Sequence, residues 1–137
     1  MSTNSLDAYS PHVLAALRIM AALLLMVHGL QKLFGFPAPM PMDIQLFSLM
    51  GLAGILETFG GALLALGLFT RPVAFVLSGF AAAAYFIGHA PNGFYPALNG
   101  GDAAILYCFV FLYLVFAGPG AWSLDNMRYR QTTLARA

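Results

Sequence analysis

The chain has 137 residues, of which 61% are hydrophobic and 8% are charged. A soluble domain carries about 25% charged residues, so this composition excludes a soluble globular enzyme. Six Lys and Arg against five Asp and Glu give a formal net charge of +1, which leaves no basic surface for nucleic acid. The single cysteine, Cys108, cannot form an internal disulfide or a redox pair. Partners are therefore expected in the lipid bilayer and among other membrane proteins.

Apolar stretches predict one all-α membrane domain over residues 1–137, a bundle of four transmembrane helices. Each stretch is near the ~20 residues that a helix needs to cross the hydrocarbon core. The second and third helices are expected to be antiparallel neighbours, joined by a tight turn at Thr70 and Arg71, with Pro72 at the helix start. The predicted helices cover residues 11–32, 46–69, 72–89 and 102–118, before a cytoplasmic tail over 122–137.

Glycines and prolines predict the connections before the second and fourth helices. Both connections are expected to lie at the membrane surface in non-helical conformation. Asp102 is predicted to be the N-cap of the fourth helix. Arg71 and the arginines after residue 122 fall on the side of both termini, whereas Lys32 falls on the other side. The positive-inside rule therefore predicts that both termini are cytoplasmic.

Ionisable side chains within the spans are the candidate functional residues, because lipid penalises each by about 2.5–3.5 kcal/mol or more. Glu57 lies near the middle of the second helix and shares a face with small residues, including Gly61, so it should point toward protein. The other polar faces follow helical spacing. They are Arg18, Ala22, Leu25, Gly29 and Lys32 in the first helix, with His28 on the flank, and Ser78, Ala81, Tyr85 and His89 in the third.

Depth along the helices predicts which of these side chains meet. At a rise of ~1.5 Å per residue, His28, Glu57 and His89 lie at similar levels in the outer half of the membrane. Tyr107, about one turn below the outer end of the fourth helix, joins them. We expect a cluster of these four side chains, one from each helix. Arg18 lies nearer the cytoplasm, so a direct Arg18–Glu57 ion pair is not favoured.

Structural roles compete with functional ones at these positions. Glu57 is either a packing carboxylate or a group that binds a ligand, a proton or a metal. His28 and His89 either meet headgroups and loop carbonyls or belong to a site. Arg18 either snorkels to phosphates or anchors the fold, and Lys32 is expected to contact headgroups. Because HExxH and ExxH spacings are absent from the sequence, no metal ligands are assigned.

Short blocks of glycine, proline and polar residues follow one another along the chain. They are His28-Gly29-Leu30-Gln31-Lys32-Leu33-Phe34-Gly35, Glu57 with Gly60-Gly61, Leu66-Gly67-Leu68-Phe69-Thr70-Arg71-Pro72, His89, Phe94-Tyr95-Pro96 with Asn99-Gly100-Gly101-Asp102, and Gly118-Pro119-Gly120 before Ser123-Leu124-Asp125. In this order the blocks resemble the DoxX family over about residues 13–126. Many relatives carry Glu where this chain has Asp102, which keeps the charge and shortens the reach.

The resemblance implies a small, four-helix protein of the bacterial inner membrane. It also implies a link to quinone-dependent redox or oxidative-stress complexes, with other redox or detoxifying proteins as partners. The family's strongest positions correspond here to Arg18, His28, Lys32, Glu57, Arg71, His89, Asn99 and Asp102.

The leading hypothesis is a subunit that binds quinone or quinol. Glu57, His28 and His89 are the candidate catalytic residues, because quinol oxidation releases protons that a side chain must accept. No haem, flavin or iron–sulfur motif is evident in the sequence, so a partner would take the electrons. The candidate ligand-binding residues are Tyr107, Tyr85, Lys32, Asn99, Asp102 and Arg18.

Two other functions stay open at this point. The first is a non-catalytic scaffold or assembly subunit, whose polar residues hold the bundle together. The second is a small-molecule transporter, for which four helices without an internal repeat are a poor basis unless they oligomerise. The small-residue faces are also compatible with a homo-oligomer.

Overall fold

The structure is a computed structural model that describes residues 5–134. These residues form helices and loops without a strand. The elements are the 3₁₀ turn η1 (Ser5–Tyr9), α1 (Ser10–Phe34), α2 (Leu49–Ile55), the π turn η2 (Leu56–Gly60), α3 (Gly61–Leu66), α4 (Thr70–Ala84), the π turn η3 (Tyr85–His89), the 3₁₀ turn η4 (Ala90–Asn92), α5 (Pro96–Asn99), α6 (Asp102–Ala117) and α7 (Leu124–Leu134).

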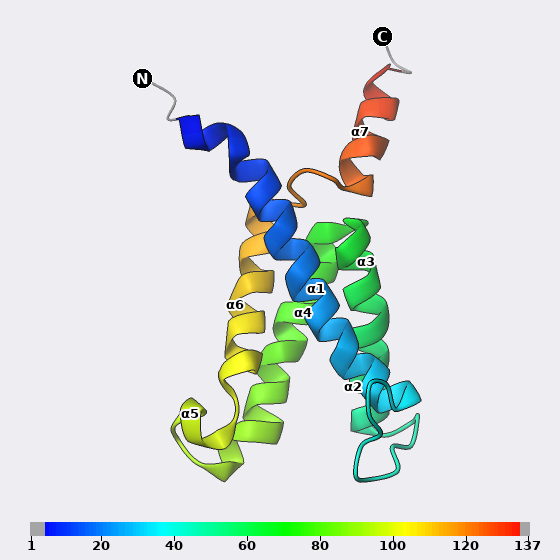
Figure 1. The fold of residues 1–137 in the computed structure, drawn as a ribbon, viewed down its shortest axis with the longest axis vertical. Coiled ribbons are helices and arrows are strands. Elements are labelled where there is room, and N and C mark those ends of the chain that lie inside the picture. Colours follow the sequence, from blue (N-terminus) through cyan, green and yellow to red (C-terminus); the bar gives the residue numbers. More distant parts are fainter. Residues whose placement is uncertain (1–4, 135–137) are drawn as a thin grey trace.

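The helical membrane bundle that the composition predicts is confirmed. Three continuous helical segments are long and apolar enough to cross a membrane, Ser5–Phe34, Leu49–Leu66 and Thr70–Asn92, and α6 is a shorter apolar helix. The first turns of α1 and helix α7 lie at one end of the bundle, whereas α5 and the α1–α2 loop lie at the other (Figure 1). The two ends of the described chain are therefore on one side, and their cytoplasmic location stays a prediction.

The second membrane helix is shorter than predicted. It begins at Leu49 instead of residue 46 and ends at Leu66, because Gly67 takes the left-handed conformation (φ +65°) that stops a helix. The turn to the next helix is thus formed by residues 67–69. Thr70 and Arg71, predicted to form this turn, are the first residues of α4.

The connection before α6 contains more helix than predicted. Ala90–Asn92 forms a 3₁₀ turn and Pro96–Asn99 a single helical turn. Asp102 is not the N-cap of the last membrane helix. Gly101 holds that position without a side-chain hydrogen bond, and Asp102 is the first helical residue.

Glycines let α1 approach the second membrane helix until the two backbones nearly touch. A Cβ atom added to Gly29 would lie 2.8 Å from the carbonyl oxygen of Gly54. A Cβ atom added to Gly61 would lie 2.9 Å from the carbonyl oxygen of Ala22. The predicted close approach at Gly61 is therefore confirmed, and its partner is α1.

Helices α4 and α6 form the second close pair of the bundle. The Ser78 hydroxyl donates a hydrogen bond of 2.8 Å to the Cys108 carbonyl oxygen across this pair. Apolar side chains from all four membrane helices meet between the two pairs. This core includes Leu25, Leu64, Leu77, Phe111 and Leu114.

Arg18 joins chain segments that are far apart in the sequence. Its side chain is fully buried, with 0% exposure, so it does not snorkel to the lipid surface. Its guanidinium donates to carbonyl oxygens at the end of α3 and in the loop between α6 and α7. The acceptors are Leu64, Ala65, Pro119, Ala121 and Trp122. Of the two roles considered for Arg18, the structure supports the anchor.

Asp125 ties α7 to the start of α4. Its carboxylate accepts hydrogen bonds of 2.9 Å from the backbone N–H groups of Phe69 and Thr70, at the helix end where a negative charge is favourable. Partial burial alone would raise the pKa of the Asp125 carboxyl. The hydrogen bonds from Thr70 and Phe69 and the charge of Arg128 outweigh this effect, so the pKa lies below its ordinary value.

We expect Arg18→Lys to destabilise the bundle. An ammonium has three N–H donors, so at least two of the five carbonyl oxygens would lose their donor. At about 1–3 kcal/mol for each buried acceptor, the free energy of unfolding should fall by roughly 2–6 kcal/mol. Thermal unfolding in detergent measures this loss, with the labelling of Cys108 by a thiol-reactive dye as the readout of unfolding. Arg130→Lys on exposed α7 is the matched control, and equal melting of both variants would contradict the anchor role.

The glycine contact predicts a second difference between matched variants. Gly29→Ala should lower the free energy of unfolding by about 1–3 kcal/mol, because the new methyl group would force the two backbones apart. Gly79→Ala places the same methyl group in α4, where nothing lies within 4 Å, and should be neutral or slightly stabilising. The same melting assay compares the two variants. A Gly29→Ala protein as stable as the wild type would show that the helices can separate without cost.

Candidate functional site

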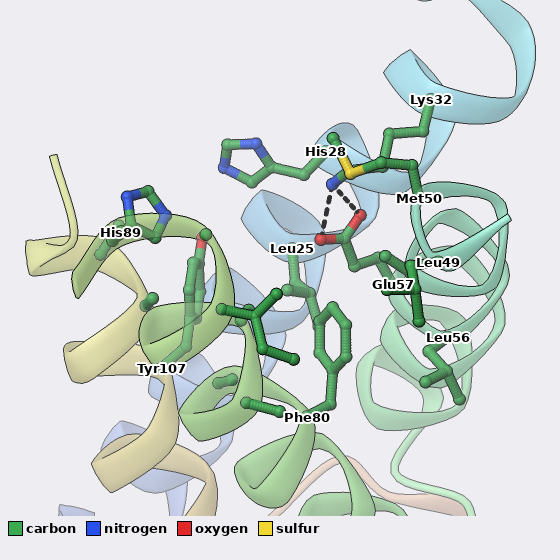
Figure 2. A pocket seen from close by; sticks show the side chains of 18 of the residues that line it. Leu25, His28, Lys32, Leu49, Met50, Leu56, Glu57, Phe80, His89 and Tyr107 are labelled. Carbon is green, nitrogen blue, oxygen red and sulfur yellow. Dashed lines mark hydrogen bonds and ion pairs between the residues drawn. The ribbon is translucent and has the colours of Figure 1, made fainter. Parts of the chain in front are cut away.

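A cavity of about 590 Å³ lies among the membrane helices, near the end of the bundle that carries α5 (Figure 2). Its volume falls within the roughly 300–1,000 Å³ of small-molecule sites. Most of its wall is apolar and comes from residues such as Leu25, Leu56 and Phe80. The polar side chains on the wall are His28, Lys32, Glu57, His89 and Tyr107. The four residues that the depth argument grouped therefore line one cavity.

Two of these polar residues lie in π turns. Glu57 belongs to η2 (Leu56–Gly60) and His89 to η3 (Tyr85–His89). In η3 the N–H of Ala90 donates to the carbonyl of Tyr85, five residues back, which widens the turn. Single π turns within α-helices occur frequently at functional sites. Both walls of the cavity thus carry a local departure from α-helix at the polar residue.

Lys32 and Glu57 form an ion pair at the cavity wall. Lys32 Nζ lies 2.8 Å from Oε1 and 2.6 Å from Oε2 of Glu57, and the two side chains are 13% and 8% exposed. The prediction that Lys32 contacts headgroups is therefore wrong. Gly54 has no side chain between α1 and α2, and a Cβ atom there would lie 3.1 Å from Lys32 Cβ. This gap lets the lysine turn inward, where a buried carboxylate needs a counter-charge.

The two histidines have different surroundings. His89 Nδ1 lies 3.1 Å from the carbonyl oxygen of Asn99, and its ring stacks on Tyr85 with centroids 6.4 Å apart. His28 is exposed and meets Tyr107 edge to face, with centroids 6.5 Å apart. His89 is thus held by protein, while His28 has freedom to turn toward a ligand or toward the membrane surface.

Asn99 takes part in the site through its backbone. Its side-chain amide donates to Gly93 O at 2.8 Å, and its side-chain oxygen accepts from Gly101 N at 2.8 Å. Both ends of the amide are therefore used inside the loop, and the carbonyl faces His89. Sequence reasoning named Asn99 as a ligand contact and did not foresee this supporting role.

Four predicted ligand-binding residues lie outside the lining of the cavity. Arg18 is bonded at the opposite end of the bundle, and Asp102 is exposed at the start of α6. Tyr85 and Asn99 contact His89 instead, through ring stacking and through the Asn99 carbonyl oxygen. The lining residues that sequence reasoning missed are mainly apolar, among them Leu49, Phe80 and Ile87, and no feature of the apolar runs marks them.

The arrangement is suited to hydrogen bonding and proton exchange next to an apolar ligand. Histidine, carboxylate and phenol groups face one space, and each can donate or accept a proton. Within residues 5–134, no group of three His, Cys, Asp or Glu side chains is close enough to hold a metal ion.

The ion pair predicts a characteristic double-mutant cycle. Lys32→Met and Glu57→Leu should each lower the free energy of unfolding by about 3–5 kcal/mol, because each leaves a buried charge without its partner. The double variant Lys32→Met/Glu57→Leu removes both charges and should regain most of the wild-type stability. Melting in detergent measures all four proteins. Additive losses in the double variant would show that the charges are not coupled.

Comparison with known proteins identifies the family. The DoxX family model matches residues 13–90, more than half of the chain. An uncharacterized protein of Haemophilus influenzae is 43% identical over 133 residues, which cover 93% of this chain and 99% of that protein. Inner membrane protein YphA of Escherichia coli is 29% identical over 134 residues, which cover 87% and 92% of the two chains. No solved structure matches significantly. With its apolar helices, the chain is a multi-pass protein of the bacterial inner membrane and belongs to the DoxX family.

Proposed function

We propose that this protein is a quinone- or quinol-binding subunit of a membrane redox or oxidative-stress complex. The observation that carries the proposal is the mostly apolar cavity with an ion pair, two histidines and a tyrosine on its wall. Apolar cavities with a few convergent polar groups are typical of small-molecule sites. A quinone has matching chemistry, because its flat apolar ring carries two opposed oxygen atoms that form hydrogen bonds.

The position of the cavity supports a ligand that is dissolved in the bilayer. Leu49, Leu52 and Ile87 line its edge and are 73%, 51% and 66% exposed, on surfaces that lipid covers in a membrane. Figure 1 shows the α4–α6 pair and the α1–α2 pair separating toward this end of the bundle. A ligand can therefore enter sideways between α2 and η3, with its apolar tail remaining in the lipid.

The polar wall supplies groups for the protons of a quinone reaction. A quinol that is oxidised loses two protons and two electrons. In our proposal His28 or His89 hydrogen-bonds a ring oxygen, and Glu57 accepts or delivers a proton while Lys32 holds its carboxylate. The electrons pass to or from a partner protein that has its own redox centre.

A scaffold function is the second candidate, and one observation favours it. Glu57 already has both carboxylate oxygens bonded to Lys32, as a carboxylate that only supports packing would. In that case the cavity residues hold the helices in position and the protein assembles other subunits. The two functions differ in what a purified protein binds.

We expect wild-type protein purified in mild detergent to carry bound quinone, detectable by mass spectrometry and ultraviolet absorption. Glu57→Gln and His89→Ala should reduce quinone occupancy about tenfold or more. The first replaces the carboxylate by a neutral amide that cannot take up a proton or pair with Lys32, and the second removes the imidazole from the cavity. Asp43→Asn removes an exposed loop carboxylate, and His12→Ala removes a histidine of a separate cavity at the other end of the bundle. These controls should keep the occupancy of the wild type.

The opposite result would support the scaffold. A wild-type protein that keeps its native assembly but stays empty, even after incubation with excess quinone, contradicts quinone binding. Melting curves of each variant separate loss of the ligand from loss of the fold.

A further inference from the structure

A second cavity, of about 600 Å³, lies at the opposite end of the bundle, between the first turns of α1 and helix α7 (Figure 1). Ala65 and Leu66, the last residues of α3, form part of its wall. A membrane helix ends where the hydrocarbon core meets the lipid headgroups. The cavity therefore lies at the depth of the headgroups, on the side of the membrane that carries both ends of the described chain.

Helix α7 presents two different faces at this end. Asp125 and Arg128, three residues apart, share the face that meets the start of α4. The Asp125 carboxylate accepts hydrogen bonds from the N–H groups of Phe69 and Thr70, and the Arg128 guanidinium lies 5.1 Å from the centre of the Phe69 ring. The charged groups of this face are thus bound within the protein.

The other face of α7 brings an arginine without a counter-ion to the cavity. Asn126, Met127 and Arg130, at spacings of three and four residues, line the cavity together. Among residues 5–134, no carboxylate lies within salt-bridge distance of Arg130. Asp7, the other described carboxylate at this end, belongs to η1 and does not line the cavity. The lining is therefore positively charged and suited to an anion.

His12 and Trp122 form the part of the wall that faces α1. Their rings meet edge to face, with centroids 5.2 Å apart. Trp122 takes the left-handed conformation (φ +50°), which is unfavourable for a residue with a side chain. Arg18 holds this conformation by donating to the Trp122 carbonyl oxygen, and the Ala121 N–H donates to the carbonyl oxygen of Pro11. The indole ring, 67% exposed, is thereby fixed beside α1, at a level where tryptophan is favoured in membranes.

The polar groups of this lining suit a phosphate, and the apolar surface next to them suits acyl chains. The guanidinium of Arg130 has the planar donor geometry that matches a phosphate, and the His12 ring carries at least one N–H donor. Leu66 lines the cavity and is 55% exposed. Leu23, eleven residues after His12 and therefore on the same face of α1, is 44% exposed. A free phosphate would leave this apolar surface uncovered.

We propose that this cavity binds the headgroup of an anionic phospholipid. The lipid phosphate bonds Arg130 and His12, and the acyl chains follow α1 and α3 into the hydrocarbon. Basic pockets next to membrane helices are typical sites for such headgroups. The bound lipid connects α7 to α1, which diverge at this end of the bundle (Figure 1). This site is separate from the cavity of the proposed function and does not depend on it.

The tryptophan of the cavity allows a direct test without a label. Trp122 is the one tryptophan of the sequence, so the tryptophan fluorescence of the full chain reports on this site. The protein is placed in phosphatidylcholine nanodiscs that contain a small fraction of brominated lipid, which quenches the indole. Brominated phosphatidylglycerol should bind about tenfold more tightly than brominated phosphatidylcholine with the same chains, the order of one charge-assisted hydrogen bond.

Matched variants locate the preference on α7 and α1. Arg130→Gln should abolish the preference for phosphatidylglycerol. Arg128→Gln removes the same charge from the same helix, outside the cavity, and should retain the preference. His12→Phe keeps an aromatic ring beside Trp122 without the N–H donor, so it should weaken the preference. Melting curves show whether each variant is folded.

Three results would overturn this inference. The first is equal quenching by the two brominated lipids in folded wild-type protein. The second is equal loss of the preference in Arg128→Gln and Arg130→Gln, which would indicate a response to overall charge. The third is displacement of phosphatidylglycerol by inorganic phosphate, compared with chloride at the same ionic strength, which would indicate a site for a free phosphate compound. A preference that persists in a protein without quinone would support the lipid site while the proposed function failed.

Discussion

The burial of the Arg18 guanidinium fixes the architecture of one end of the bundle. Carbonyl groups at a helix end need donors, and hydrocarbon supplies none, so a side chain with several donors becomes the common partner of these ends. Gly67 leaves space for this partner, because a Cβ atom there would lie 2.9 Å from Arg18 Nη1. Asp125 closes the start of α4 at the same end. With the helices joined here, the two helix pairs diverge toward the other end, and the cavity lies between them.

The polar residues inside the membrane differ in how fully their bonding capacity is used. All five N–H groups of the Arg18 guanidinium donate to backbone carbonyls, so none is left to bind a ligand. At the cavity, the bond that the described residues make to the His89 ring uses Nδ1, and Lys32 retains one N–H beyond its two bonds to Glu57. Burial alone therefore does not distinguish a functional polar residue from an anchoring one. The distinction lies in the donors and acceptors that the protein leaves unpaired.

Much of the fold and part of the site could be predicted from the sequence. Hydropathy located the spans, and helical rise placed His28, Glu57, His89 and Tyr107 at a common depth, which is the level of the cavity. The inward turn of Lys32 could not be predicted from its own helix, because it depends on the gap at Gly54 of another helix. The π turns could not be predicted either, because one extra residue in a uniformly apolar helix does not change the hydropathy pattern. The Asn99 amide was assigned to a ligand because its loop partners are set by the tertiary fold.

The same geometry suggests why such a site would be divided between two helix pairs. Glu57 and its counter-charge come from η2 and α1, while His89 is held by η3 and the loop before α6. A carboxylate paired with a lysine and an imidazole bonded to a backbone carbonyl have different partners, which a single helix face would bring close together. Separate helix pairs keep the two environments apart and still expose both to one ring. In our proposal, a ligand with two opposed oxygen atoms bridges them and thereby connects the two helix pairs across the cavity.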